Sequence, residues 1–277
     1  MILLQGYVII KVISAIRVGH IMLEVLSYGG GVQSTAICLL IFENRLPKPD
    51  WIVFSDTGSE RPETYETVKQ ISLLAGLNDV PFAIVSAKDK LHEGYQARES
   101  LPMVGISICT HKYKIRPIRR FIRAELKTNG IHNNGVLGKK PWANVWLGIS
   151  TDERKRVRES DRKYISNKFP LIEMNWSRND CISYLKNFPE LKVEKSGCFM
   201  CMYQTAAGWN DLKRKHPDLF DIALELEKVG MEGKNKLKGL FRSSESIEKF
   251  NHTHTLGDFG FDLEGMDDCE SQGGCFL

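Results

Sequence analysis

The fold is decided by one stretch, Glu24-Val25-Leu26-Ser27-Tyr28-Gly29-Gly30-Gly31-Val32-Gln33-Ser34-Thr35-Ala36-Ile37-Cys38-Leu39-Leu40. An apolar run precedes three glycines and apolar residues at helical spacing follow them, which predicts a strand, a loop and a helix. Backbone N–H groups in such a loop, with the positive end of the helix dipole, suit a phosphate group. Ser34 and Thr35 are expected to cap the helix or to donate to a phosphate oxygen. The alternative is a plain glycine turn before a capped helix.

Two familiar phosphate loops are excluded by residues that are missing. No lysine lies between the glycines and Ser34, so the P-loop pattern fails, and G-x-G-x-x-G lacks its last glycine. The stretch instead resembles the PP-loop of N-type ATP pyrophosphatases, S-G-G-x-D-S, with Gly29 replacing the serine and Gln33 replacing the aspartate. In Gln33, and in Ser27-Tyr28 ahead of the glycines, it resembles the phosphoadenosine phosphosulfate (PAPS) reductase-like branch. Without the aspartate, a role for Mg²⁺ stays open.

The composition is that of an ordinary soluble globular protein with one main domain. Hydrophobic residues make up 42% and charged residues 26% of the 277 residues, and no apolar run reaches the roughly 18 residues of a membrane span. Residues 1–21 are apolar but contain Lys11 and Arg17, and no cleavage pattern follows them, so we expect an N-terminal extension and not a signal peptide. We therefore expect a cytoplasmic protein that does not contact a membrane.

Apolar runs alternate with helical patterns after the glycine loop. Strands are predicted at Trp51–Phe54, Val80–Val85 and Val145–Ser150, and a shorter one at Asn167–Glu173. Residues 86–108 are expected to form a lid-like excursion. This alternation predicts an α/β fold with a doubly wound parallel sheet. The family resemblance implies the Rossmann-like fold of adenine nucleotide alpha-hydrolases, here in residues 22–195, with a small helical and cysteine-containing appendage in residues 196–277.

Two further segments extend the resemblance. Ser55–Glu66 follows a predicted strand and is similar to the D-T-G…P-E-T-Y segment of PAPS reductases, although Asp56 or Ser59 could simply cap a helix. Val145–Arg158 is similar to the G-I-x…E…R segment, or is only a strand before a charged helix. The resemblance implies adenine beside Gly148 and Ile149 and an anion at Arg156. The nucleotide-binding set that it implies is Ser27, Tyr28, Gly29, Gly30, Gly31, Gln33, Ser34, Asp56, Thr57, Gly58, Gly148, Ile149 and Arg156.

The chain has seven cysteines and no secretory signal, which favours metal or redox chemistry over structural disulfides. Cys198 and Cys201 form a C-x-x-C pair that fits zinc, an iron–sulfur cluster or a redox dithiol. With Cys109 upstream and cysteines near the carboxyl end, the arrangement resembles sulfonucleotide reductases that hold a 4Fe–4S cluster. Those enzymes carry adjacent cysteines where this chain has only Cys109, so Cys269 is the expected replacement ligand. Zinc and reversible disulfides remain alternatives.

The other cysteines are assigned different roles. Cys275 follows Gly273-Gly274 near the end of the chain, and the tail resembles the family's mobile segment that brings a reactive cysteine to the nucleotide. We therefore predict that Cys275 is catalytic, the alternative being that Cys275 is the fourth ligand and Cys269 is spare. The E-C-G-x-H sequence of true reductases is absent. Cys38 and Cys181 lie in apolar or helical patterns and are expected in the core.

Two basic clusters, Lys112–Arg123 and Arg154–Lys163, suit phosphates, although each is also compatible with a solvated helix face. The basic clusters favour a polyanionic partner, and the absence of E-C-G-x-H argues against a reductase. Together they favour an ATP pyrophosphatase that adenylates a nucleic acid for sulfur incorporation, as in DNA phosphorothioation or RNA thiolation. A cysteine desulfurase would supply the sulfur. One alternative is a reductase of PAPS or adenosine phosphosulfate (APS), which would use a thioredoxin-type partner. The other is a non-catalytic nucleotide- or nucleic-acid-binding module with a structural metal.

Overall fold

The computed structural model of the chain describes residues 2–4, 7–10, 22–128, 141–233, 238–242 and 245–251. These residues belong to two compact units. Unit 1 comprises Met1–Asp56, Glu60–Ala87 and Tyr113–Ser196, and unit 2 comprises Thr57–Ser59, Lys88–Lys112 and Gly197–Leu277. No helix within the described ranges is long and apolar enough to cross a membrane.

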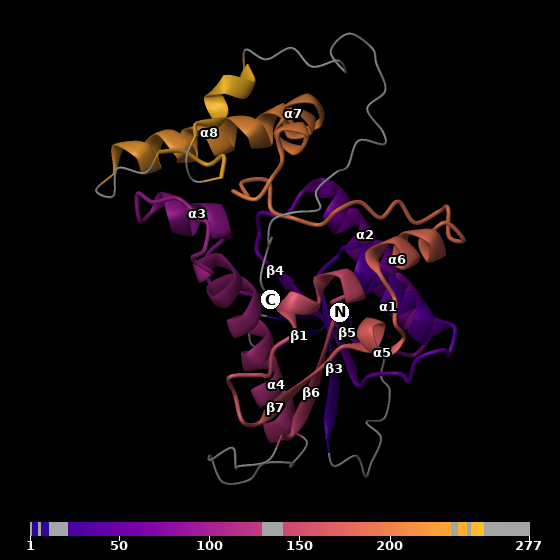
Figure 1. Ribbon diagram of the computed structural model, residues 1–277. Helices are drawn as coiled ribbons and strands as arrows, with labels where there is room; N and C mark the ends of the chain where they lie inside the picture. The colour runs from indigo at the N-terminus through magenta and orange to yellow at the C-terminus, as the bar shows by residue number, and fades with distance from the viewer. Residues whose placement is uncertain are drawn as a thin grey trace. The chain divides into compact units, whose positions relative to one another are not determined.

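Unit 1 is built on one sheet, in which the strand order is β1-β2-β5-β4-β3-β6-β7 (Figure 1). The five strands from β5 to β7 are parallel, which confirms the predicted fold class. An antiparallel pair, β1 and β2, continues the sheet beyond β5 and lies within the predicted extension at residues 1–21. The strands are β1 (Ile2–Leu4), β2 (Tyr7–Ile10), β3 (Leu23–Tyr28), β4 (Trp51–Asp56), β5 (Phe82–Ser86), β6 (Ala143–Leu147) and β7 (Ile165–Lys168).

Helices cover both faces of the parallel strands, as a buried parallel sheet requires. On one side, α1 (Val32–Phe42) packs against α2 (Pro62–Leu77), α5 (Pro170–Glu173) and α6 (Arg178–Leu185). On the other, α4 (Arg116–Thr128) packs against β3, β4 and β5, following the π-helical segment η1 (Thr110–Ile115). Side chains alternate accordingly along β4, where Ile52 belongs to the α1 core and the ring of Trp51 meets that of Phe121 of α4 at 5.1 Å.

The local sequence accounts for the helix ends, with one correction. Gly31 is the N-cap of α1, without a side-chain capping bond, so a cap at Ser34 or Thr35 is wrong. Arg61 is the N-cap of α2, also without such a bond, which excludes the alternative of a cap at Asp56 or Ser59. Pro62 starts α2 because a proline at the first helical position loses no helical hydrogen bond. Ser177 caps α6, because it forms a reciprocal capping box with Asp180.

The last strand lies earlier in the chain than the predicted range Asn167–Glu173. β7 ends at Lys168, and Pro170-Leu171-Ile172 starts α5, because proline suits a first helical turn and cannot donate to a sheet. Residues 86–108, where a lid-like excursion is expected, are not without regular structure. They contain α3 (Leu91–Gln96), whose hydrophobic face is buried in unit 2 at Leu91 and Tyr95.

Unit 2 is a helical assembly. α8 (Pro217–Glu232) packs against α3, α7 (Ala206–Lys215) and the short helix η3 (Ile247–Asn251). The Glu227 carboxylate, 2% exposed, accepts hydrogen bonds from the backbone N–H groups of Leu240 at 2.6 Å and Ile247 at 2.9 Å. A buried carboxylate with such partners fixes the chain that follows α8, since an unpaired one would be costly.

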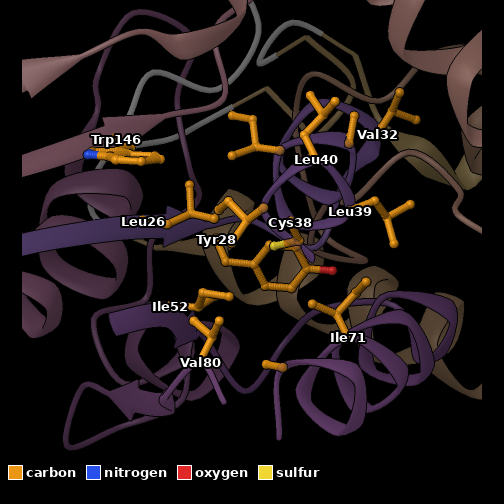
Figure 2. Packing of buried hydrophobic residues seen from close by; sticks show 14 of the residues in the cluster. Leu26, Tyr28, Val32, Cys38, Leu39, Leu40, Ile52, Ile71, Val80 and Trp146 are labelled. Carbon is orange, nitrogen blue, oxygen red and sulfur yellow. The ribbon is translucent and has the colours of Figure 1, made fainter. Parts of the chain in front are cut away.

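Tyr28 belongs to the core of unit 1. The Tyr28 ring lies among Cys38, Ile52 and Ile71 (Figure 2). Only 2% of the residue is exposed, and this burial raises the pKa of its phenol. The hydroxyl pairs with Thr35 Oγ1 at 3.1 Å. A contribution of Tyr28 to nucleotide binding would therefore come through its backbone.

We expect Tyr28→Phe to lower the free energy of unfolding by about 1–2 kcal/mol, because the buried Thr35 hydroxyl loses its partner. Urea unfolding measures this change, and calorimetric titration with ATP should give an unchanged affinity. Full stability with lost ATP affinity would instead place the phenol at the nucleotide.

Candidate nucleotide site

The candidate nucleotide site lies at the end of β3, where the order of the strands in the sheet changes direction. β3 is paired on one side with β4, the next strand in sequence, and on the other with β6, which follows only after β5 and α4. Ligands of open α/β sheets bind beyond the carboxyl ends of strands at this topological switch point. The loops that start here are Gly29–Gly31 after β3 and Gly148–Ser150 after β6.

The glycine loop is shaped by contacts that leave no room for side chains. Gly30 has φ +72°, and a Cβ there would lie 2.8 Å from Thr64 Cγ2. A Cβ on Gly31 would lie 2.6 Å from Ser196 Oγ. The Ser34 hydroxyl closes the loop, accepting from the Gly29 N–H at 3.3 Å and donating to the Gly31 carbonyl at 3.2 Å. Any larger residue at position 30 would thus disturb folding as well as ligand binding.

Gly148 brings β6 against the start of α1. A Cβ at this position would lie 3.0 Å from the Ser34 backbone nitrogen and 3.3 Å from its Cα. Both neighbours are backbone atoms, so they cannot rotate away. The missing side chain therefore lets the loop after β6 lie beside the first N–H groups of α1, which is where a helix dipole attracts an anion.

A polar network surrounds the first turn of α1. The Gln33 amide donates to Glu153 Oε2 at 3.2 Å and accepts from Arg178 Nη1 at 3.1 Å. Glu153 also forms an ion pair with Arg156, and the Arg178 backbone N–H donates to Asp152 Oδ1 at 2.9 Å. The segment η2 (Thr151–Arg156) and the start of α6 thus bring two guanidinium groups into the network around the first turn of α1.

The loop after β4 is divided between the two units. Asp56 ends β4 in unit 1, where its carboxylate accepts a hydrogen bond from the Tyr65 hydroxyl at 2.8 Å. Burial, and next this carboxylate, raise the pKa of Tyr65. Thr57 and Gly58 belong to unit 2. Their predicted role as nucleotide contacts therefore stays a prediction.

The structure sorts the remaining predicted residues into two groups. Gly29, Gly30, Gly31, Gln33, Ser34, Gly148 and Arg156 come together at the switch point. Ser27 and Ile149 are 4% and 2% exposed, so that, like Tyr28, they offer backbone and not side chain. Sequence reasoning missed Glu153 and Arg178 as partners of Gln33. Arg178 follows the recognisable cap at Ser177, but its approach to Gln33 depends on the packing of α6 against α1.

Three of the predicted cysteine ligands lie in unit 2. Cys198 and Cys201 close a tight turn in which the Cys201 N–H donates to the Cys198 carbonyl at 3.2 Å, and Cys109 immediately precedes η1. Within the described ranges, no three histidine, cysteine or acidic side chains gather into a metal-binding group. The described cysteines alone therefore do not provide a complete cluster site. Cys269 and the predicted catalytic Cys275 lie outside the described residues.

Cys38 and Cys181 are core residues, as predicted. Both are fully buried within the hydrophobic cluster of unit 1. Burial raises the pKa of Cys38, and it raises that of Cys181 to about 12, so both thiols stay protonated near neutral pH.

Comparison with known sequences identifies the family. The profile of the phosphoadenosine phosphosulfate reductase domain matches residues 24–190, which hold the five parallel strands and both switch-point loops. The chain belongs to this PAPS reductase domain family. The match ends before the C-x-x-C turn, so the part of unit 2 from Gly197 onward lies outside the matched residues.

Two uncharacterised proteins of Methanocaldococcus jannaschii are similar over longer stretches. One is 24% identical over 230 residues, covering 79% of this chain and 51% of the relative. The other is 24% identical over 204 residues, covering 70% of this chain and 39% of the relative. The chain thus spans about half, or less, of the length of these relatives.

Solved structures include two distant neighbours. The phosphate complex of PAPS reductase from Candida auris has 17% identity and a TM-score of 0.42. This match covers 62% of this chain and 74% of the reductase chain. The U34-tRNA thiolase NcsA from Methanococcus maripaludis, with its 4Fe–4S cluster, has 15% identity and a TM-score of 0.39. This match covers 83% of this chain and 80% of the thiolase chain. Likeness at this level supports no inference about the reaction of this chain.

We expect Gly148→Ala to destabilise unit 1 by about 1–3 kcal/mol, because β6 and the start of α1 must separate to admit the methyl group. The same shift should lower ATP affinity. Chemical unfolding and calorimetric titration measure the two effects. Gly208→Ala on α7 is the control, since its added Cβ meets Thr205 Oγ1 at an ordinary 3.4 Å. Equal stability and affinity in Gly148→Ala and the wild type would disprove the close approach.

Proposed function

We propose that the protein is an ATP pyrophosphatase that activates a nucleic acid for sulfur incorporation. In this reaction an acceptor oxygen attacks the α-phosphorus of ATP, the new P–O bond forms and pyrophosphate leaves. A sulfur donor then bonds to the activated atom, and AMP leaves with the acceptor oxygen. The glycine loop, the amino end of α1, and Arg156 and Arg178 are the groups that would hold the triphosphate.

The observation that carries this proposal is the contact between two basic clusters of unit 1. Arg119 of α4 forms an ion pair with Asp161, and the Arg123 guanidinium lies 5.5 Å from the centre of the Tyr164 ring. These contacts join the two basic clusters, which lie more than 30 positions apart in the sequence. The exposed basic residues of α4 and of residues 154–163, which together are called the basic surface, are Arg116, Arg120, Arg123, Lys127, Arg154, Lys155, Arg158, Arg162 and Lys163.

The basic surface continues from the candidate site. Arg156 lies in the polar network beside α1, and Arg158, Arg162 and Lys163 follow it along the chain toward α4. A polyanion bound there would run past the bound nucleotide. A small sulfonucleotide needs no such extended surface, whereas a nucleic acid gains most of its non-specific affinity from contacts of this kind.

The source of sulfur is part of the proposal. A cysteine desulfurase would supply the sulfur, whereas a thioredoxin-type partner belongs to the alternative reductase. A 4Fe–4S cluster on Cys109, Cys198, Cys201 and Cys269, with zinc as alternative, stays a prediction, as does a chemical role for Cys275. We assign no step to a cluster, because the ligands within the described ranges do not form a complete site.

A second candidate is reduction of PAPS or APS, which the matching family profile favours by its name. The two reactions release different products. Purified protein is incubated with ATP and with PAPS, each with and without RNA or duplex DNA and a reducing agent, while pyrophosphate and sulfite are followed. We expect pyrophosphate from ATP, increased by one of the nucleic acids. Sulfite from PAPS, without pyrophosphate from ATP, would establish the reductase instead.

The surface makes a separate prediction. The triple variant Arg116→Glu, Arg120→Glu, Lys163→Glu should bind nucleic acid at least about tenfold more weakly, and the slope of log K against log salt should fall by about 0.7–0.9 per lost phosphate contact. Lys69→Glu, Lys186→Glu, Lys192→Glu is the matched control, because it makes the same charge change at exposed lysines of unit 1 outside the basic surface. Equal losses in both triple variants would show an effect of net charge alone.

A further inference from the structure

Position 33 on α1 bears on whether a metal ion can accompany a nucleotide at the first turn of that helix. The PP-loop motif that this stretch resembles has an aspartate here, and Mg²⁺ is usually held by one or two carboxylates together with substrate phosphates. This chain has Gln33 instead, and the first turn of α1 contains no acidic residue. A magnesium ion at this turn would therefore need a carboxylate from another segment.

Glu153 of η2 is the carboxylate that contacts Gln33, and both of its oxygens are already engaged. Oε2 accepts a hydrogen bond from the Gln33 amide at 3.2 Å, and Oε1 forms the ion pair with Arg156. The side chains of Glu153 and Arg156 are 27% and 21% exposed, so water screens this pair only in part. A cation placed at Glu153 would lie beside the Arg156 guanidinium and be repelled by it.

Arg178 occupies the remaining polar atom of the Gln33 side chain. Its Nη1 donates to Gln33 Oε1 at 3.1 Å, so the amide oxygen that could ligate a metal faces a guanidinium. The neighbouring carboxylate of Asp152 accepts from the Arg178 backbone N–H at 2.9 Å, which fixes the start of α6 and with it the base of this side chain. The donor set around position 33 thus does not fit a magnesium ion.

The same network fits a phosphate. A guanidinium stays protonated at neutral pH, and its fork of N–H donors matches the geometry of phosphate oxygens. Gln33 meets a carboxylate with its N–H group and a guanidinium with its oxygen, so it holds the Glu153–Arg156 pair and Arg178 on one side chain. The positive charge next to position 33 therefore comes from the protein itself.

We infer that Arg178 takes the place of a magnesium ion in the nucleotide site, so that the protein binds ATP without a divalent cation. The inference rests on the proposed function, because it takes the glycine loop and the first turn of α1 as the triphosphate site. Arg178 and Arg156 supply the charge that an ion would otherwise bring, while Gln33 and Glu153 hold the two guanidinium groups. All four residues belong to unit 1.

Calorimetric titration of the full chain with ATP, in excess Mg²⁺ and in excess EDTA, tests this inference. We expect ATP to bind in EDTA at least as tightly as in Mg²⁺, because the ion neutralises charge on the phosphates that the guanidinium groups would contact. Binding that requires Mg²⁺ overturns the inference and leaves the nucleotide site standing, and loss of this requirement in Asp56→Asn would place the ion at the end of β4. Absence of binding under both conditions overturns the inference and the site together.

A single variant tests the role of the guanidinium. Arg178→Ala should bind ATP at least about tenfold more weakly in EDTA, since charge-assisted hydrogen bonds to phosphate are lost. The bond from the backbone N–H of residue 178 to Asp152 is kept, so the start of α6 is preserved. Arg45→Ala is the matched control, because it removes an exposed guanidinium beyond the carboxyl end of α1 and should leave the affinity unchanged. Equal affinity in Arg178→Ala and the control would overturn the inference.

The double variant Gln33→Asp, Arg178→Ala reverses the arrangement. The new carboxylate would face Glu153 without a guanidinium between α1 and α6, and Mg²⁺ can be held by two carboxylates and the phosphates. Addition of Mg²⁺ should therefore raise the ATP affinity of this variant at least about fivefold, the lower end of ordinary couplings between ligands. Mg²⁺ alone should also raise its free energy of unfolding, which urea titration measures without ATP. A double variant that responds to Mg²⁺ no more than the wild type would show that positions 33 and 178 do not determine the metal requirement.

Discussion

The close approach of two backbones at the switch point is the constraint on which the site depends. Gly148 lies so near Ser34 that a methyl group at that position would meet the backbone at the start of α1. Pairing of β3 with β6 brings the two loops together, and the absence of side chains at Gly30, Gly31 and Gly148 lets them stay there. The strand order determines where the site is, and the glycines determine that backbone N–H groups line it.

Ser34 and Gln33 show how the site adapts to an altered loop. The Ser34 hydroxyl bonds to the loop backbone at both ends and takes no part in a helix cap. Gln33, where the resembled motif has an acidic residue, is neutral and binds both a carboxylate and a guanidinium. An aspartate here would face Glu153 with like charge. The network therefore explains why an amide fits this position, and it places Arg156 and Arg178 beside the predicted phosphate site.

The sequence predicts the parallel sheet well because its signals are local. Apolar runs such as Trp51–Phe54 and the glycine triplet each determine one element, and their order along the chain implies the doubly wound arrangement. The expectation of a strand at Asn167–Glu173 fails for an equally local reason, because Pro170 starts the helix α5. The Arg178–Gln33 contact could not be predicted, because it requires α6 to pack on α1 across 145 positions of sequence.

The central claim is that an adenine nucleotide binds at the switch point between β3 and β6. A crystal structure of the full chain with a non-hydrolysable ATP analogue tests it most directly. The account predicts the phosphates over the N–H groups of Gly29–Gly31 and the first turn of α1, Arg156 or Arg178 in contact with a phosphate oxygen, and the base beside Gly148 and Ile149. An analogue bound elsewhere on unit 1, with the glycine loop and the Gln33 network unchanged, would contradict it.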